Sequence, residues 1–213
     1  MPWLADAPLA GRRLLVFDLD GTVADTNPIH AATFQQVFDR YGVTIDYATV
    51  AGLRMDEAID KLAADHGLAL DAAERADLAD AKRRATAACM AEVQPLPGAR
   101  AFLERVRRTH RLAMVTSGQR GRVNDTLAQM SFAGWFDPLI VGDDLTRAKP
   151  DPEGYARVLA LTGVPAAEAL VFEDAEAGIA AARAAGIDVV VIGDAPVAGE
   201  QAWRWHELME AAA

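Results

Sequence analysis

Residues 14–22 constrain the fold of this chain more than any other stretch. Four apolar residues at 14–17 predict a short buried strand, and two carboxylates, Asp18 and Asp20, follow directly after it. Buried parallel strands are apolar on both faces and carry functional groups at their carboxyl ends. Because two acids at one strand end repel each other and are costly to desolvate, we expect a hard divalent cation such as Mg²⁺ between them. The alternative is a polar turn in which both acids are exposed.

The composition is that of a globular protein with a sizeable core. Of the 213 residues, 52% are hydrophobic and 24% are charged, and no apolar run approaches the roughly 20 residues that span a bilayer. The first residues lack the basic start and long apolar stretch of a signal peptide. The net charge of −10 disfavours a nucleic acid as partner but permits a small anionic substrate in a locally positive pocket. We therefore expect a cytoplasmic protein that binds neither a membrane nor a nucleic acid.

The single cysteine, Cys89, cannot form an internal disulfide, so nothing calls for an oxidising compartment. It lies beside Met90 in an alanine-rich helical pattern. We interpret it as a packing residue and not as a nucleophile.

Hydrophobic periodicity separates a helical insertion from an α/β remainder. Residues 28–93 carry three helical patterns, over about 31–41, 58–63 and 71–93, with no strand-like alternation between them. Pro95 and the pair Pro97-Gly98 then mark a boundary. We therefore predict that residues 1–27 and 94–213 form an α/β core and that residues 28–93 form an all-helical insertion.

The remainder of the chain alternates strands and helices. The expected strands are 14–17, 112–115, 139–141, 169–172 and 188–192, and the expected helices are 99–108, 122–132, 152–162 and 175–185. Alternation of this kind predicts a parallel sheet with helices on both faces. A short helix over 201–213 carries Trp203 and Trp205, which we expect to pack against the core or against a second subunit. The chain is therefore expected to be a monomer or a homodimer.

Polar side chains follow several of these strands at the point where each strand ends. They are Asp18, Asp20, Ser117, Lys149, Glu173 and Asp174. Because the carboxyl ends of parallel strands border one crevice, we expect these side chains to meet although they span most of the sequence. Each also has a structural alternative, since a serine can cap a helix, a lysine can be solvated and an acidic pair can complement a helix dipole. Their joint placement favours a site.

These residues resemble the haloacid dehalogenase superfamily of aspartyl-phosphate hydrolases, in the subgroup with a helical cap inserted after the first strand. Four blocks carry the resemblance: DLDGT at 18–22, TSG at 116–118, KPDP at 149–152, and FED at 172–174 with Gly178. They cover nearly the whole chain outside residues 28–93. The resemblance implies a Rossmann-like core of three layers with a parallel sheet, and a cap that selects the substrate.

The resemblance also implies catalytic roles. Asp18 would be the nucleophile that forms an aspartyl-phosphate, and Asp20 would protonate the leaving group and then deprotonate water. Ser117, with a backbone amide near Gly118, would hold phosphoryl oxygens, and Lys149 would offset their negative charge.

A metal site is implied by the same resemblance. Mg²⁺ would be held by the Asp18 carboxylate, the main-chain carbonyl of Asp20 and the Asp174 carboxylate, with waters completing the octahedron. Glu173 would either orient the waters of the metal or ligate it directly. Asp143 and Asp144 resemble no catalytic block, and we interpret them as loop acids.

The second acid separates reaction classes within the superfamily. Dehalogenases that resemble this fold lack the acid at Asp20, because a halide leaves without a proton, and phosphonatases carry a small residue there. We therefore expect a phosphatase that cleaves the phosphate ester of a small metabolite, either phosphoglycolate or a sugar phosphate.

Three residues are candidates for contacts that select the substrate. Thr26 and His30 follow the catalytic loop where related sugar-phosphate enzymes place residues that face the substrate, and Arg54 follows Gly52 closely enough to reach a distal group. The alternatives are a structural histidine at a helix start and a solvated arginine.

Two other functions are considered. A phosphomutase resembling beta-phosphoglucomutase would carry a lysine just before the cap glycine and an arginine a few residues later, but Ala51 occupies the first position and Arg54 is one residue too near Gly52. A non-catalytic binding protein on the same fold would have lost the catalytic acids, which are all present.

Overall fold

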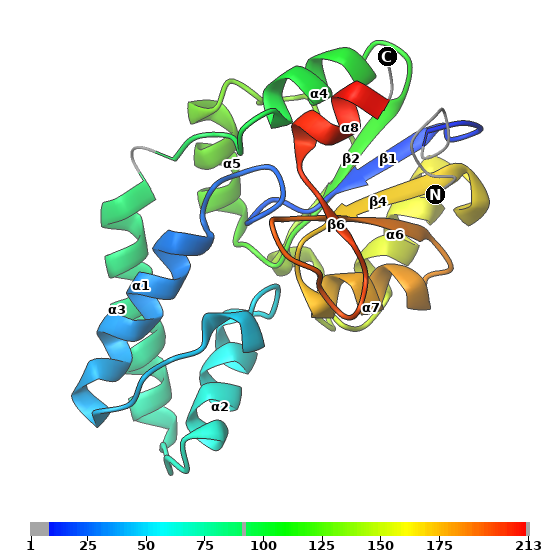
Figure 1. Cartoon of the computed structure of the whole chain (residues 1–213). Helices are drawn as coiled ribbons and strands as arrows, with labels where there is room; N and C mark the ends of the chain where they lie inside the picture. Colours follow the sequence, from blue (N-terminus) through cyan, green and yellow to red (C-terminus); the bar gives the residue numbers. More distant parts are fainter. Residues whose placement is uncertain (1–8, 91–92, 212–213) are drawn as a thin grey trace.

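The computed structural model describes residues 9–90 and 93–211, which contain a six-stranded parallel sheet (Figure 1). The strand order is β3-β2-β1-β4-β5-β6, so β1 lies at the centre, with Leu14 opposite Arg111 of β2 and Ala169 of β4. The strands are β1 (Leu14–Phe17), β2 (Arg111–Val115), β3 (Leu139–Ile140), β4 (Ala169–Glu173), β5 (Asp188–Ile192) and β6 (Ala202–Trp203). The five expected strands are confirmed to within one residue at either end. The sixth was not expected, because its two residues carry no apolar run; it pairs with the end of β5.

Helices cover both faces of the sheet and give the expected three layers. They are α4 (Ala99–Val106), α5 (Arg120–Gln129), α6 (Glu153–Thr162), α7 (Glu176–Ala184) and α8 (Trp205–Ala211). Alternate residues of β1 point to opposite faces, so Leu15 and Phe17 pack with α4, α5 and α8, whereas Leu14 and Val16 pack with α6 and α7. In Figure 1, α4 and α8 accordingly lie on one side of the strands and α6 and α7 on the other.

The C-terminal segment is anchored in the core by Trp205. Its indole is buried against the rings of Phe102 and Phe172, with centroids 4.8 and 5.3 Å away, and its Nε1 donates a hydrogen bond to the carbonyl of Thr22 (2.8 Å). The expected packing is therefore confirmed for Trp205. The tail helix begins at residue 205 and not at 201, since residues 202–203 form β6, and residues 212–213 lie outside the described part.

Three helices with a hydrophobic core of their own follow β1. They are α1 (Asn27–Phe38), α2 (Met55–Asp65) and α3 (Ala72–Cys89), with short 3₁₀ turns at Asp39–Tyr41 and Tyr47–Thr49. Their buried side chains, among them Phe38, Ile59, Leu62 and Leu78, pack together and not on the sheet. Within the described residues of 28–93 no strand occurs, as expected; residues 91–92 lie outside the description. No helix of the described ranges is both long and apolar enough to cross a bilayer.

The interpretation of Cys89 as a packing residue is wrong, because its side chain is exposed. Helix α3 buries Leu78, Lys82 and Thr86 at intervals of four residues, and the next position of that row is Met90. An alanine-rich helix carries little amphipathic signal, so the sequence did not show on which side of this row Cys89 falls.

Candidate active site

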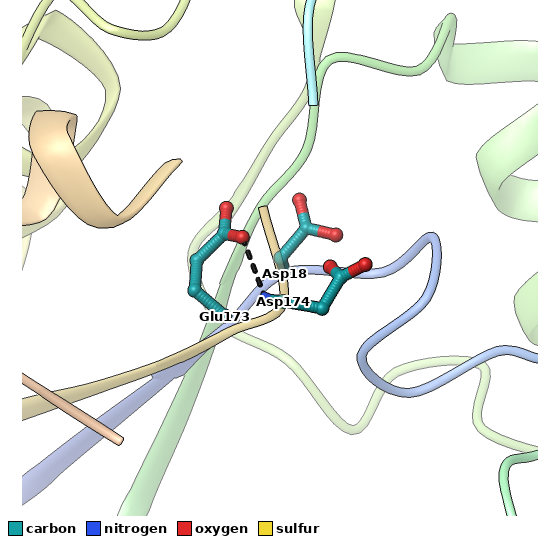
Figure 2. Close-up of side chains that lie close together, drawn as sticks. All are labelled: Asp18, Glu173 and Asp174. Atoms are coloured by element: carbon teal, nitrogen blue, oxygen red, sulfur yellow. Dashed lines mark hydrogen bonds between the residues drawn. The ribbon is translucent and has the colours of Figure 1, made fainter. Parts of the chain in front are cut away.

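Three carboxylates meet at the carboxyl ends of the two central strands. Asp18 follows β1, Glu173 ends β4, and Asp174 follows it; one oxygen atom of each lies within 4.8 Å of the others. Figure 2 shows the three side chains together, with the dashed line marking the hydrogen bond from the Asp174 backbone to Glu173. The expected meeting of these acids therefore occurs, and parallel pairing of β1 with β4 causes it.

Lys149 lies between two of the carboxylates. Its Nζ donates to Asp18 Oδ1 (2.6 Å) and to Glu173 Oε1 (2.5 Å), and also to the carbonyl of Val115 (3.2 Å). All three charged side chains are buried. Burial opposes the charge on Lys149, but the two carboxylates outweigh burial and raise the pKa of Lys149 well above its ordinary value. Lys149 is therefore a fixed cation beside Asp18.

Both oxygens of Glu173 are already engaged by the protein. Oε1 accepts from Lys149 and from the hydroxyl of Tyr155 (3.3 Å), and Oε2 accepts from the backbone N–H groups of Asp174 (2.9 Å) and Ala175 (3.0 Å). Of the two roles expected for Glu173, this arrangement favours orientation of neighbouring groups over direct ligation of a metal.

The cluster carries more negative charge than Lys149 compensates. Burial raises the pKa of Asp18 well above its ordinary value, and Lys149 offsets only part of that rise. Burial, together with the charge of Glu173, raises the pKa of Asp174 to about 7. Clustered carboxylate oxygens with unfavourable charge are the ligands that a hard divalent cation prefers. The residues present therefore fit a divalent metal ion.

Two glycines of the expected blocks make room for these acids. Gly21 has a φ of 81°, and a Cβ on it would lie 2.1 Å from Asp174 Oδ2 and 2.2 Å from Asn27 Nδ2. A Cβ on Gly178 would lie 1.7 Å from Glu173 Oε1. Both positions therefore need glycine so that backbone and carboxylate can approach each other.

Asp20 is surrounded by hydrogen-bond donors. Arg122 binds it in a bidentate manner, with Nη1 2.9 Å from Oδ1 and Nη2 2.6 Å from Oδ2. Oδ1 also accepts from Thr26 Oγ1 (2.8 Å) and lies 3.2 Å from His30 Nε2. Burial raises the pKa of Asp20, but Arg122 and His30 outweigh it, and the pKa lies well below its ordinary range. Thr26 and His30, expected to face the substrate, thus contact Asp20.

A buried lysine supports His30 from α3. Lys82 Nζ lies 2.8 Å from His30 Nδ1, and burial lowers the pKa of Lys82 to about 7. Burial also lowers the pKa of His30, so its imidazole is neutral near pH 7. When Nδ1 accepts from Lys82, the imidazole proton is on Nε2 and is donated to Asp20.

The expected phosphate-binding groups lie at the end of β2, against a loop of the insertion. Ser117 Oγ donates to the carbonyl of Gly52 (2.7 Å), and the Gly118 N–H donates to Thr116 Oγ1 (3.1 Å). Arg54 lies two residues beyond Gly52, at the start of α2, with its side chain one-third exposed.

A cavity of about 800 Å³ opens between the insertion and the sheet. Core residues that line it include Asp18, Asp20, Ser117, Gly118 and Arg122, and residues of the insertion include His30, Arg54 and Lys82. Asp143 also borders the cavity, but its Oδ2 accepts from the Arg120 backbone (2.6 Å), and Asp144 pairs with the Arg120 side chain. Both remain loop acids, as expected. The cavity is much larger than a phosphoryl group and leaves space for a leaving group.

Residues 15–192 match the family model of haloacid dehalogenase-like hydrolases. The chain belongs to this family. Its relatives include protein CbbY of Rhodobacter capsulatus, 33% identical with 94% of this chain and 95% of the relative covered. The fructose-1-phosphate phosphatase YqaB of Escherichia coli is 32% identical, with coverage of 83% and 94%. A solved structure of a CbbY variant of Rhodobacter sphaeroides with xylulose 1,5-bisphosphate matches with a TM-score of 0.75 at 25% identity, covering 91% of this chain and 92% of that one.

The family assignment confirms the resemblance in the sequence blocks. The chain is an enzyme of the phosphatase type, and its family implies a divalent metal ion, for which the acidic cluster is suited.

Two contacts of this hydrolase were not expected from its sequence, namely those of Arg122 and Lys82. Nothing distinguishes Arg122 from Arg120 in the sequence, and Lys82 lies in an alanine-rich helix among other charged residues. The structure also places Gly118 beside this contact: a Cβ on Gly118 would lie 2.2 Å from Arg122 Nη2, so the guanidinium would have to shift.

Proposed function

We propose that this hydrolase is a Mg²⁺-dependent phosphatase that cleaves a small phosphorylated metabolite, a sugar phosphate or phosphoglycolate, through an aspartyl-phosphate on Asp18. The observation that carries the proposal is the pairing of Asp18 with buried Lys149 beside a second acid, Asp20, at the wall of a cavity of about 800 Å³. The cytoplasm remains the expected compartment, and the choice between monomer and homodimer remains open to measurement.

The reaction follows from the two acids. Asp18 attacks phosphorus, the bond from phosphorus to the ester oxygen breaks, and Asp20 gives its proton to the leaving alkoxide. Because Arg122 and His30 hold the pKa of Asp20 well below its ordinary range in the free enzyme, Asp20 must take up this proton after the substrate has bound. Asp20 then takes a proton from water, the water oxygen attacks the phosphorus of the aspartyl-phosphate, and inorganic phosphate leaves with Asp18 restored. Lys149 offsets the negative charge on the nucleophile and the phosphoryl oxygens throughout.

Mg²⁺ would be held by the carboxylates of Asp18 and Asp174 and by the main-chain carbonyl of Asp20, with Glu173 orienting its neighbours. When bound, the ion supplies neutralisation of the charge on nucleophile and phosphate. The double engagement of Glu173 by Lys149 and by two backbone amides supports this division of roles.

Residues 28–93 would act as a cap that excludes water and contacts the leaving group. Their separate hydrophobic core supports this role, as does the hydrogen bond from Ser117 to Gly52, which ties a phosphate-binding residue to the insertion. Binding of a phosphoryl group would take the Ser117 hydroxyl from Gly52. Mutase activity is not favoured, since Ala51 stands where a mutase of this family would carry lysine.

The test is phosphate release from phosphoglycolate, several hexose and pentose phosphates, beta-glucose 1-phosphate and an aryl phosphate, with Mg²⁺ or with a chelator. Wild type should release phosphate with Mg²⁺ only. Asp18→Asn should lose about a thousandfold or more in kcat/KM. The control Asp143→Asn, which replaces a loop acid that borders the same cavity, should retain activity.

Two results would contradict the proposal. Phosphate release that persists in Asp18→Asn would rule out an aspartyl-phosphate intermediate on Asp18. Conversion of beta-glucose 1-phosphate to glucose 6-phosphate without release of phosphate would establish a mutase.

A further inference from the structure

Arg122 reaches the active site along an unusual path. It lies in the first turn of α5, and its guanidinium passes over the bare Cα of Gly118 to bind both oxygens of Asp20. Its side chain is one-quarter exposed and lines the cavity. A cation is therefore presented to the substrate cavity by a helix of the core, on the same side as Asp18.

Asp20 does not depend on Arg122 for its position. Its Oδ1 also accepts from Thr26 and lies within hydrogen-bonding distance of His30, and both of these side chains are buried. The carboxylate therefore retains two partners when the guanidinium moves away. Arg122 is held differently, because every hydrogen bond that its side chain makes to another described residue ends on Asp20.

The phosphoryl group has a separate cation. Lys149 contacts Asp18 directly and is locked by Glu173, so it stays beside the nucleophile. The guanidinium of Arg122 is therefore not needed to neutralise the phosphoryl group beside Asp18. Its planar pair of N–H donors matches another anion, either a carboxylate or a second phosphate.

The remaining basic residues on the cavity wall come from the insertion. Arg54 lies 3.8 Å from Asp56, Lys82 is turned to His30, and Arg83 pairs with Asp80. The same lining also carries Asp56, Asp125 and Asp143, so the positive charge in the cavity is local to these basic side chains. Beside one of these cations, a leaving group with its own negative charge is bound better than a neutral one.

We infer that Arg122 recognises a second anionic group on the substrate, a carboxylate or a second phosphate, by exchanging Asp20 for that group. The inference rests on the proposed phosphatase function and names its substrate class: small phosphate esters whose leaving group is itself an anion. The exchange replaces one bidentate anion by another, so the guanidinium loses little. It also frees Asp20 Oδ2 to face the leaving oxygen.

The test compares substrates that differ only in the second anion. Phosphoglycolate is paired with 2-hydroxyethyl phosphate, and 6-phosphogluconate is paired with glucitol 6-phosphate, so each pair exchanges a carboxylate for a hydroxymethyl group. The variants are Arg122→Gln, Arg122→Lys and the matched control Arg120→Gln, two positions away on the same helix and paired with Asp144 outside the cavity lining.

Wild type should prefer the anionic member of at least one pair by about 10- to 100-fold in kcat/KM, the range of a charge-assisted bidentate contact. Arg122→Gln should bring the ratio close to one, mainly through a higher KM for the anionic member. Arg122→Lys should retain part of the preference, and Arg120→Gln should retain all of it.

A binding measurement separates this inference from the proposed function. Calorimetric titration of Asp18→Asn with 6-phosphogluconate and glucitol 6-phosphate should show the same preference, and the added Arg122→Gln change should abolish it. An equal loss for both members of each pair would overturn the inference, because Arg122 would then act on Asp20 or on the phosphoryl group alone. If the anionic ligand is bound preferentially but wild type hydrolyses none of the esters, the proposed phosphatase function fails and the anion-binding role of Arg122 stands.

Discussion

Gly178 offers the sharpest test of how the acidic cluster is held. In Gly178→Ala the new Cβ would lie 1.7 Å from Glu173 Oε1 and 2.0 Å from Cδ, whereas contacts shorter than about 3.0 Å are not tolerated. Glu173 is fully buried, and Oε1 is the atom that accepts from Lys149 at 2.5 Å. The buried carboxylate must therefore shift, and we expect the shift to break this ion pair.

The expected magnitude follows from two opposing effects. Breaking a buried ion pair costs about 3–5 kcal/mol, and replacing glycine by alanine inside a helix returns about 1 kcal/mol. The net loss in the free energy of unfolding should be about 2–4 kcal/mol. Urea denaturation measures it directly.

Gly121→Ala is the matched control, since Gly121 also lies in the first turn of a helix and a Cβ there meets nothing within 4 Å. Its free energy of unfolding should equal or exceed that of wild type by up to about 1 kcal/mol. If both variants unfold at the same urea concentration, Glu173 is not confined as described and the reasoning fails.

Three further predictions concern stability. Lys149→Met should lower the free energy of unfolding by about 3–5 kcal/mol, because two buried carboxylates lose their cation, and wild-type stability in urea would contradict this. The pKa of Asp174 is about 7 in the folded chain and about 3.9 when unfolded, so the folded state retains a proton that the unfolded state releases. Stability without metal should therefore fall as the pH rises from about 4 to 7. The part contributed by Asp174 is at most about 4 kcal/mol, and Asp174→Asn should remove that part of the slope, whereas the raised pKa of Asp18 keeps the rest. Trp205→Phe should cost about 1–2 kcal/mol, because the Thr22 carbonyl loses its buried donor, and an unchanged thermal midpoint would refute that assignment.

The secondary structure was largely predictable because its signals are local. Each of the five expected strands, including the one at 14–17, appears in the sequence as a short hydrophobic run. Every expected helix outside the insertion overlaps an observed one. Two kinds of feature were missed for physical reasons. Strand β6 depends on pairing with β5 and not on its own residues, and the exposed side of Cys89 depends on how α3 packs.

The acidic cluster was predictable for a related reason. Parallel strands bring their carboxyl ends to one edge whatever their spacing in the sequence, so placing Asp18 and Asp174 after apolar runs was enough to predict that both lie at this edge. The pairing of β1 with β4 then determines which acids are neighbours, and this pairing is visible only in the folded chain.

The sequence by itself determined the family, the parallel sheet and the residue types at the strand ends, because each depends on short-range patterns and on four blocks of residues. Tertiary structure alone decided the partners of these residues. Arg122 binds Asp20, Lys82 contacts His30, and Lys149 donates a hydrogen bond to Glu173. Such contacts join elements up to 102 residues apart through side chains that any exposed helix can carry. Their positions follow from the packing of helices on the sheet and on one another, for which neither composition nor periodicity carries a signal.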